Sequence, residues 1–135
     1  MSCGNNRLIV EMKQGESRSF AFTIKNKTGG YTNDKPDYEP YNLNDCIIEF
    51  DIKEYPFESV TPIIHKVLTT NDVSDSYILQ PPEDGKFVVN ISATDTIGLS
   101  PDKEYSLVIT LVNGDTRIII SADDNNSGVF RFCKQ

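Results

Sequence analysis

Residues 99–120, which read LSPDKEYSLVITLVNGDTRIII, constrain the fold more than any other part of the sequence. Apolar side chains occupy every second position in the middle of this stretch, at Tyr105, Leu107, Ile109 and Leu111. This alternation is typical of a β-strand with one buried face. Asn113-Gly114 follows, and the pair favours a tight hairpin because both residues tolerate positive φ. The β-branched run at 116–120 then predicts the returning strand.

The same alternation recurs along most of the chain and predicts an all-β protein. Further strands are expected at residues 8–13, 19–25, 46–53, 63–68, 77–80, 86–91 and 129–132. Turn-forming residues separate these segments, and none of them has the period of a long helix. Short strands between regular turns favour two packed sheets. We therefore expect an immunoglobulin-like β-sandwich of about 7–9 antiparallel strands.

The chain has 135 residues, which fits a single domain with its own hydrophobic core. We expect residues 8–133 to form this domain and the polar residues 1–7 to be a flexible arm. The first two strands are either neighbours in a hairpin or members of opposite sheets. The three cysteines are too scattered to predict a disulfide framework or a zinc site: Cys3, Cys46 and Cys133.

Two short segments fit the connections that a sandwich needs. Ser92 and Asp95 suit a capped turn, in which the serine oxygen accepts from the amides ahead and the carboxylate lies at the positive end. Such a turn would carry the chain from one sheet to the other. Residues 99–101 and Tyr105 resemble the tyrosine corner of immunoglobulin-like domains, where the tyrosine bonds back to nearby backbone.

Residues 26–44 have no period and are predicted to form a long loop that contains Tyr31, Tyr38 and Tyr41. Tyrosine supplies large, stiff contact area with a polar tip, so these rings are candidates for binding a partner. The alternative is that they lie back over the edge of the sandwich. Tyr55 and Phe57, just after the strand at 46–53, complete the predicted partner-binding set.

The charge of the chain limits its partners. The sequence has 20 acidic and 13 basic residues and a formal net charge of −7. Nucleic acids and anionic membrane surfaces both recruit basic groups, so neither is an expected partner. No apolar run approaches the length of about 20 residues that a membrane helix needs. We therefore expect no nucleic acid and no membrane among the partners.

The sequence does not predict catalysis or a bound cofactor. His65 is its only histidine, and a single histidine in a strand is usually structural or exposed. There is no glycine-flanked nucleophile and no phosphate-binding glycine loop. Asp123, Asn125 and Ser127 occupy the first, third and fifth positions of a calcium loop. Lys134 stands where the bidentate glutamate belongs, so a plain hairpin loop is favoured over a metal site.

The sequence resembles the amino-terminal immunoglobulin-like domain of tailed-phage baseplate upper proteins, and more broadly such modules of phage capsid and tail proteins. The resemblance covers most of the chain and is carried by Gly15 with the strand that follows, by the segments 43–52, 85–91, 95–96, 99–101 with Tyr105, and 128–130. Asp102 stands where that family usually has glycine after proline, which predicts a wider turn. The chain stops at Gln135, where baseplate proteins continue into a connector, and this favours a free-standing module.

The resemblance implies a non-enzymatic structural protein of the virion, made in the cytoplasm of the bacterial host. It would dock on the capsid or tail in several copies, decorate the particle or attach a fibre, and have other phage structural proteins as partners. The alternative is a carbohydrate-binding β-sandwich module in which Tyr31, Tyr38 and Tyr41 stack on a glycan.

Overall fold

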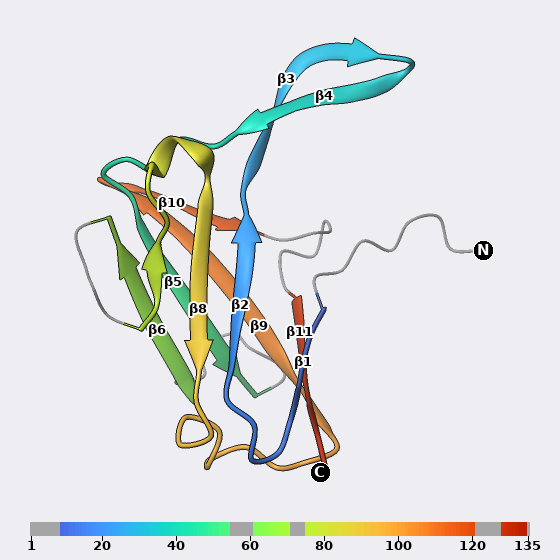
Figure 1. Ribbon diagram of the computed structural model, residues 1–135, viewed down its shortest axis with the longest axis vertical. Helices are drawn as coiled ribbons and strands as arrows, with labels where there is room; N and C mark the ends of the chain where they lie inside the picture. The colour runs from blue at the N-terminus through green and yellow to red at the C-terminus, as the bar shows by residue number, and fades with distance from the viewer. Residues whose placement is uncertain (1–8, 55–60, 71–74, 121–127, 135) are drawn as a thin grey trace.

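The structure is a computed structural model that describes residues 9–54, 61–70, 75–120 and 128–134. Its strands in chain order are β1 (Ile9–Lys13), β2 (Arg18–Thr23), β3 (Lys25–Thr32), β4 (Lys35–Pro40), β5 (Ile47–Lys53), β6 (Ile64–Thr69), β7 (Tyr77–Ile78), β8 (Lys86–Ile91), β9 (Lys103–Asn113), β10 (Thr116–Ile120) and β11 (Gly128–Cys133) (Figure 1). The described helical structure is one short 3-10 turn at Pro82–Asp84. The prediction of an all-β sandwich is confirmed.

The larger sheet is built around β9, the longest strand. Its order is β1-β11-β9-β5-β6, and β10 also pairs with β9. Strand β5 pairs with one edge of β9 along residues 106–112. The other edge is shared, because β11 pairs with residues 103–107 and β10 with residues 109–113. The stretch that dominates the sequence is therefore also the centre of this sheet.

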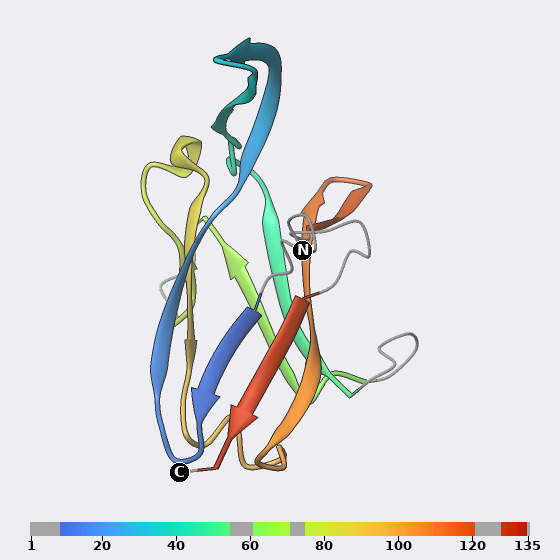
Figure 2. The ribbon, with the colours of Figure 1, turned by 90° about the vertical axis from the view of Figure 1, so that its right-hand side faces the viewer.

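The smaller sheet has the order β2-β8-β7 and packs against the larger one (Figure 2). Phe22 of β2 joins the two layers: its ring centroid lies 6.0 Å from that of Phe50 in β5 and 5.1 Å from that of Phe87 in β8. The largest fully buried side chains come from both sheets and, at Leu43, from the connection between β4 and β5: Phe50, Phe87, Phe130, Phe132, Met12, Leu43, Ile48, Ile52, Leu68, Ile91, Leu107 and Leu111. Each such burial contributes about 1.5–3 kcal/mol relative to an exposed side chain, so this core dominates the stability of the fold.

One strand pair corrects the expectation that all strands are antiparallel. Strands β1 and β11 run parallel, with Val10 opposite Phe130 and Met12 opposite Phe132. Strands β1 and β2 belong to opposite sheets, so the turn between them crosses from one layer to the other. Parallel neighbours are not joined by a tight turn. Their pairing therefore leaves no local signal in the sequence.

The hairpin after β9 forms one residue later than predicted. Asn113 pairs with Thr116, so the two loop residues are Gly114 and Asp115 rather than Asn113 and Gly114. Gly114 has φ +60°, and Asn113 does not have positive φ. Glycine with positive φ at the first loop position is typical of a type II′ turn. The prediction of a hairpin was correct, and its register was wrong by one residue.

The tyrosine corner is present. The backbone N–H of Ser100 donates to Tyr105 Oη at 2.6 Å, and the Tyr105 side chain is buried. Asp102 has φ +61°, a left-handed conformation that glycine adopts more readily than other residues. The corner is therefore formed with an aspartate at this position.

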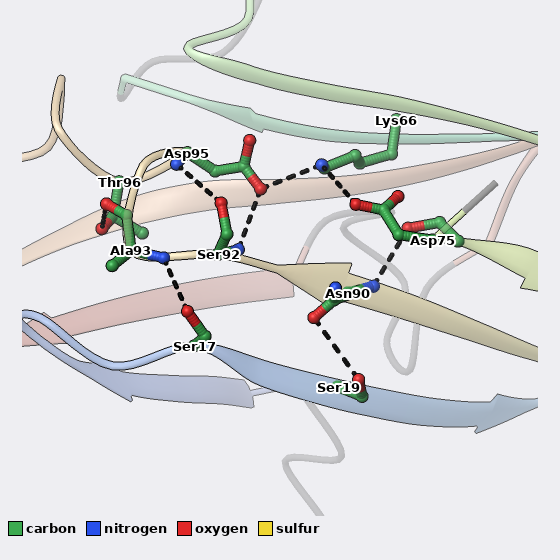
Figure 3. A network of polar contacts seen from close by, with 10 residues as sticks. Ser17, Ser19, Lys66, Asp75, Asn90, Ser92, Ala93, Asp95 and Thr96 are labelled. Carbon is green, nitrogen blue, oxygen red and sulfur yellow. Dashed lines mark hydrogen bonds and ion pairs between the residues drawn. The ribbon is translucent and has the colours of Figure 1, made fainter.

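A polar network joins the sheets where the chain leaves β8 (Figure 3). The Ser92 N–H donates to Asp95 Oδ2 at 2.9 Å, and the Asp95 N–H donates to Ser92 Oγ at 3.1 Å. Lys66 of β6 places its Nζ 2.9 Å from Asp95 Oδ2. Ser17 accepts a hydrogen bond from the Ala93 N–H at 2.9 Å. The predicted capped turn is thus formed, and Lys66 ties it to the larger sheet.

The electrostatics of Asp95 follow from this network. Burial by itself would raise the pKa of Asp95, but the hydrogen bond from the Ser92 amide and the neighbouring Lys66 ammonium lower it below its usual range. The carboxylate is therefore better stabilised in the folded chain than in the unfolded chain.

Candidate partner-binding surface

Residues 25–40 form a two-stranded hairpin that projects beyond the sandwich (Figures 1 and 2). The prediction of an irregular loop here was wrong, and with β3 and β4 the described strands number eleven. The turn uses Asn33 and Asp34, with φ +52° and +65°, which are side chains that tolerate this conformation. The strands escaped prediction because both faces are largely exposed and a bulge between Lys27 and Tyr31 shifts the register.

One face of this hairpin carries the aromatic residues. Pro36 and Tyr38 are two residues apart in β4, and Tyr31 lies directly opposite Pro36, so all three share a face. The Tyr31 residue is 72% exposed and Tyr38 is 52% exposed. Exposed tyrosines are enriched where proteins bind partners, because their burial yields much contact area at low entropic cost. We call Tyr31, Pro36 and Tyr38 the tyrosine face.

The opposite face is polar. Asp37 and Glu39 alternate with the residues of the tyrosine face along β4 and so lie on its reverse side. Two local hydrogen bonds link residues of this region: the Gly30 N–H donates to Thr28 Oγ1 at 3.2 Å, and Thr28 Oγ1 donates to the Asp37 carbonyl at 3.4 Å. The hairpin is therefore a two-sided ribbon, with aromatic rings on one side and carboxylates on the other.

Tyr41 lies apart from the other two tyrosines. Its side chain is half-buried and packs against the hydrophobic core at the base of the hairpin. Its N–H donates to the Ile24 carbonyl at 2.9 Å, and the Ile24 N–H donates to the Gly85 carbonyl at 2.8 Å. Tyr41 thus fixes where the hairpin leaves the sandwich, while Tyr31 and Tyr38 remain accessible.

The close approach of Ile24 and Tyr41 at the lower end of the hairpin requires a glycine at position 85. Gly85 has φ +70°, and a Cβ atom there would lie 2.5 Å from the Ile24 carbonyl oxygen and 2.9 Å from the Tyr41 carbonyl oxygen. No side chain fits this space without moving the backbone at Ile24 and Tyr41.

The other predicted site residues lie outside the described residues. These are Tyr55 and Phe57 of the partner-binding set and Asp123, Asn125 and Ser127 of the calcium-loop pattern. Among the residues that the structure describes, no group of three or more histidine, cysteine, aspartate or glutamate side chains could hold a metal ion. In the same residues no helix is long and apolar enough to cross a membrane.

His65 has a partner that the sequence did not reveal. Asp51 of β5 lies opposite His65 of β6, and Asp51 Oδ1 forms a hydrogen bond with His65 Nδ1. Asp51 is buried, whereas the His65 side chain is 49% exposed. Asp51 belongs to a segment with an ordinary alternating strand pattern, so nothing in the sequence indicated that this carboxylate is buried and paired with His65. The hydrogen bond gives the buried Asp51 carboxylate a polar partner, which agrees with the prediction that His65 is structural or exposed.

Cys46 and a pocket between β1 and β2 are the two further features that bear on reactivity. Burial raises the pKa of the Cys46 thiol, and the negative charge of Asp45 raises it further, so Cys46 is a poor nucleophile. An open pocket of about 230 Å³ lies between β1 and β2 and is lined by Glu11, Met12, Lys13, Glu16 and Arg18. Its charges are mixed, and the Arg18 guanidinium donates to the Glu11 carbonyl at 3.3 Å. Neither feature assembles a nucleophile with a base.

Comparison with known proteins adds no functional assignment. No protein-family model matches the sequence, and no curated protein is significantly similar to it.

Proposed function

We propose that this protein is a non-enzymatic structural component of a bacteriophage particle that docks on the capsid or tail through the tyrosine face. The observation that carries the proposal is the exposure of Tyr31 and Tyr38 on one side of a ribbon that projects from the sandwich. The phage assignment rests on the sequence resemblance described above. It implies several copies in each particle, localisation to the virion and other phage structural proteins as partners.

The shape of the hairpin supports a protein partner. A projecting ribbon with stiff aromatic rings can enter a groove that a flat sheet cannot reach. The base of the ribbon is held by the hydrogen bonds at Ile24, Tyr41 and Gly85, so its direction is set before binding. A surface positioned in this way loses less conformational entropy when it binds. The chemistry of the partner is expected to be apolar with polar groups that reach the tyrosine hydroxyls.

The proposal is tested by co-sedimentation of the purified full chain with phage particles that lack it. The chain is expected to co-sediment, and the variant Tyr31→Ala/Tyr38→Ala is expected to bind about 30-fold more weakly, as for the truncation of hot-spot tyrosines. Tyr77→Ala is a matched control, because Tyr77 is also a partly exposed strand tyrosine but lies on β7. It should bind like the wild type. Equal binding by all three proteins would overturn the role of the tyrosine face.

Carbohydrate binding is the competing function, because two exposed tyrosines on one face also form a stacking platform. The half-buried Tyr41 is not available for such stacking. A glycan array and mass spectrometry of purified particles separate the two functions. A monomeric chain that binds a glycan and is absent from particles would refute the virion role and support the carbohydrate-binding module.

A further inference from the structure

A second surface lies along the outer edge of β2 and β3. These strands follow one another almost without interruption from the sandwich to the hairpin, with only Ile24 between them (Figure 2). Strand β8 pairs with β2 and strand β4 pairs with β3. Both partners lie on the same side, because Ile24 donates its N–H to Gly85 and accepts from Tyr41 through its C=O. In the part of the chain that the structure describes, no strand pairs with the other side.

The register shows which backbone groups point to this open edge. Ile24 directs its N–H and C=O toward β8 and β4, so the residues at odd positions direct theirs away. These residues include Ser19, Ala21, Thr23 and Lys25, all of which are exposed. The edge is regular over 18–27, before the bulge, and is about 30 Å long at about 3.3 Å per residue.

The edge differs in charge from the rest of the molecule. Between Glu16 and Asp34 the sequence contains Arg18, Lys25 and Lys27 and no acidic residue, whereas the whole chain has a net charge of −7. Lys25 is exposed and forms no ion pair with any described residue. The positive charge near the hairpin base is therefore not neutralised there by the described residues.

We propose that the open edge of β2 and β3 receives an extended acidic segment of a partner protein, which adds to it as a further strand. Strand addition satisfies the outward N–H and C=O groups, and the acidic side chains of the added strand pair with the basic ones of the edge. Glu11 and Glu16 lie near the Arg18 end. The acidic side chains of the segment are therefore expected close to Lys25 rather than to Arg18.

A second copy of the chain is a poorer occupant. Lysines on an open edge discourage pairing between identical edges, because like charges then face each other. The same lysines attract an acidic segment, because opposite charges then face each other. The inference depends only on the strand edge and its charge, so it stands independently of the tyrosine face and of the assignment to a virion.

The test uses the full chain labelled with ¹⁵N and a synthetic peptide of about ten residues that alternates threonine and glutamate. The peptide is expected to slow amide hydrogen exchange at Ser19, Ala21, Thr23 and Lys25. Amides of β6, which is the outer strand of the larger sheet, serve as the internal control and should not change. A peptide that alternates threonine and lysine should bind at least fivefold more weakly.

Two variants separate hydrogen bonding from charge. Ala21→Pro removes an outward N–H without removing a bond to β8 and should weaken the acidic peptide about tenfold. Lys25→Glu/Lys27→Glu keeps the backbone and should weaken it at least fivefold. Lys35→Glu is the matched control, because this exposed lysine lies on β4 and not on the open edge. Circular dichroism of each variant confirms that it is folded.

The inference fails if millimolar acidic peptide leaves the four amides unchanged, if the basic peptide protects them equally, or if protection appears on β6 instead. Tyr31→Ala/Tyr38→Ala should retain full peptide binding. This result distinguishes failure of the edge from failure of the proposed docking through the tyrosine face.

Discussion

The central strand β9 and the hairpin of β3 and β4 are both regular β-structure, but they are held by different forces. Strand β9 has neighbours on both edges and buries Tyr105, Leu107, Ile109 and Leu111. The hairpin has one paired edge in each strand and exposes most of its side chains. Alternating hydrophobicity therefore marks β9 clearly and is missing from the hairpin. Burial, rather than strand formation itself, produces the pattern that sequence reasoning detects.

The two regions also differ in what they contribute to stability. The sandwich supplies nearly all of the buried apolar surface, while the hairpin supplies the two exposed tyrosines. The two regions meet at Ile24, Tyr41 and Gly85. Substitutions in the sandwich or at this junction should therefore change the free energy of unfolding, and substitutions on the tyrosine face should not.

The largest effect is expected at the junction. Gly85→Ala should lower the free energy of unfolding by about 3 kcal/mol, because it combines a positive φ with a clash against two carbonyl oxygens. Gly114→Ala is the matched control: its φ is also positive, but nothing lies within 4 Å of the added Cβ. It should cost about 1 kcal/mol. Urea denaturation measures both. Equal losses would show that the close approach at Gly85 contributes nothing.

The tyrosine corner should come next. Tyr105→Phe removes the acceptor of the Ser100 N–H and should destabilise the sandwich by about 1–2 kcal/mol. Tyr38→Phe, which removes a hydroxyl from the exposed hairpin, is the control and should change stability by less than about 0.5 kcal/mol. Thermal unfolding of both variants gives the difference. A loss at Tyr38 as large as that at Tyr105 would contradict the division between the two regions.

A smaller effect that depends on pH is expected at Asp95. Its folded pKa is lowered, so the unfolded chain binds the proton more readily and the contribution of the carboxylate is present above the unfolded pKa of about 3.9. This contribution is lost as the pH falls through the folded pKa. Asp95→Asn should destabilise the protein by about 1 kcal/mol at neutral pH.

Chemical denaturation of wild type and Asp95→Asn between neutral pH and about pH 2 tests this sign, because the window lies at and below the ordinary aspartate pKa of about 3.9. The difference in stability should shrink as the pH falls. Lys66→Met should reduce the difference at neutral pH without abolishing it, since Lys66 contacts Asp95 but the Ser92 N–H also donates to the carboxylate. A difference that grows on acidification would contradict the lowered pKa.

The smallest effect on stability is expected on the tyrosine face. Tyr31→Ala/Tyr38→Ala should change the free energy of unfolding by less than about 0.5 kcal/mol, because neither ring belongs to the core. Tyr41→Ala is the contrasting variant and should cost at least about 1 kcal/mol, because its ring packs on the core. Urea denaturation measures both. A large loss in the double variant would mean that the hairpin is part of the folding unit.

The sequence by itself determined the all-β class, the inward residues of the buried strands and the tyrosine corner at Tyr105, because each depends on neighbours close in the chain or on a period of two. Tertiary structure alone decided the parallel pairing of β1 with β11, the partnership of Asp51 with His65 and the open edge of β2 and β3. The first two features join residues that are distant in the sequence, and the third depends on which strand edge has no neighbour. Neither produces a pattern in a short stretch of sequence. The hairpin was only partly predictable from the sequence. Asn33 and Asp34 are residue types that favour its turn, but its strands are largely exposed and therefore lack the alternating apolar pattern that identifies a buried strand.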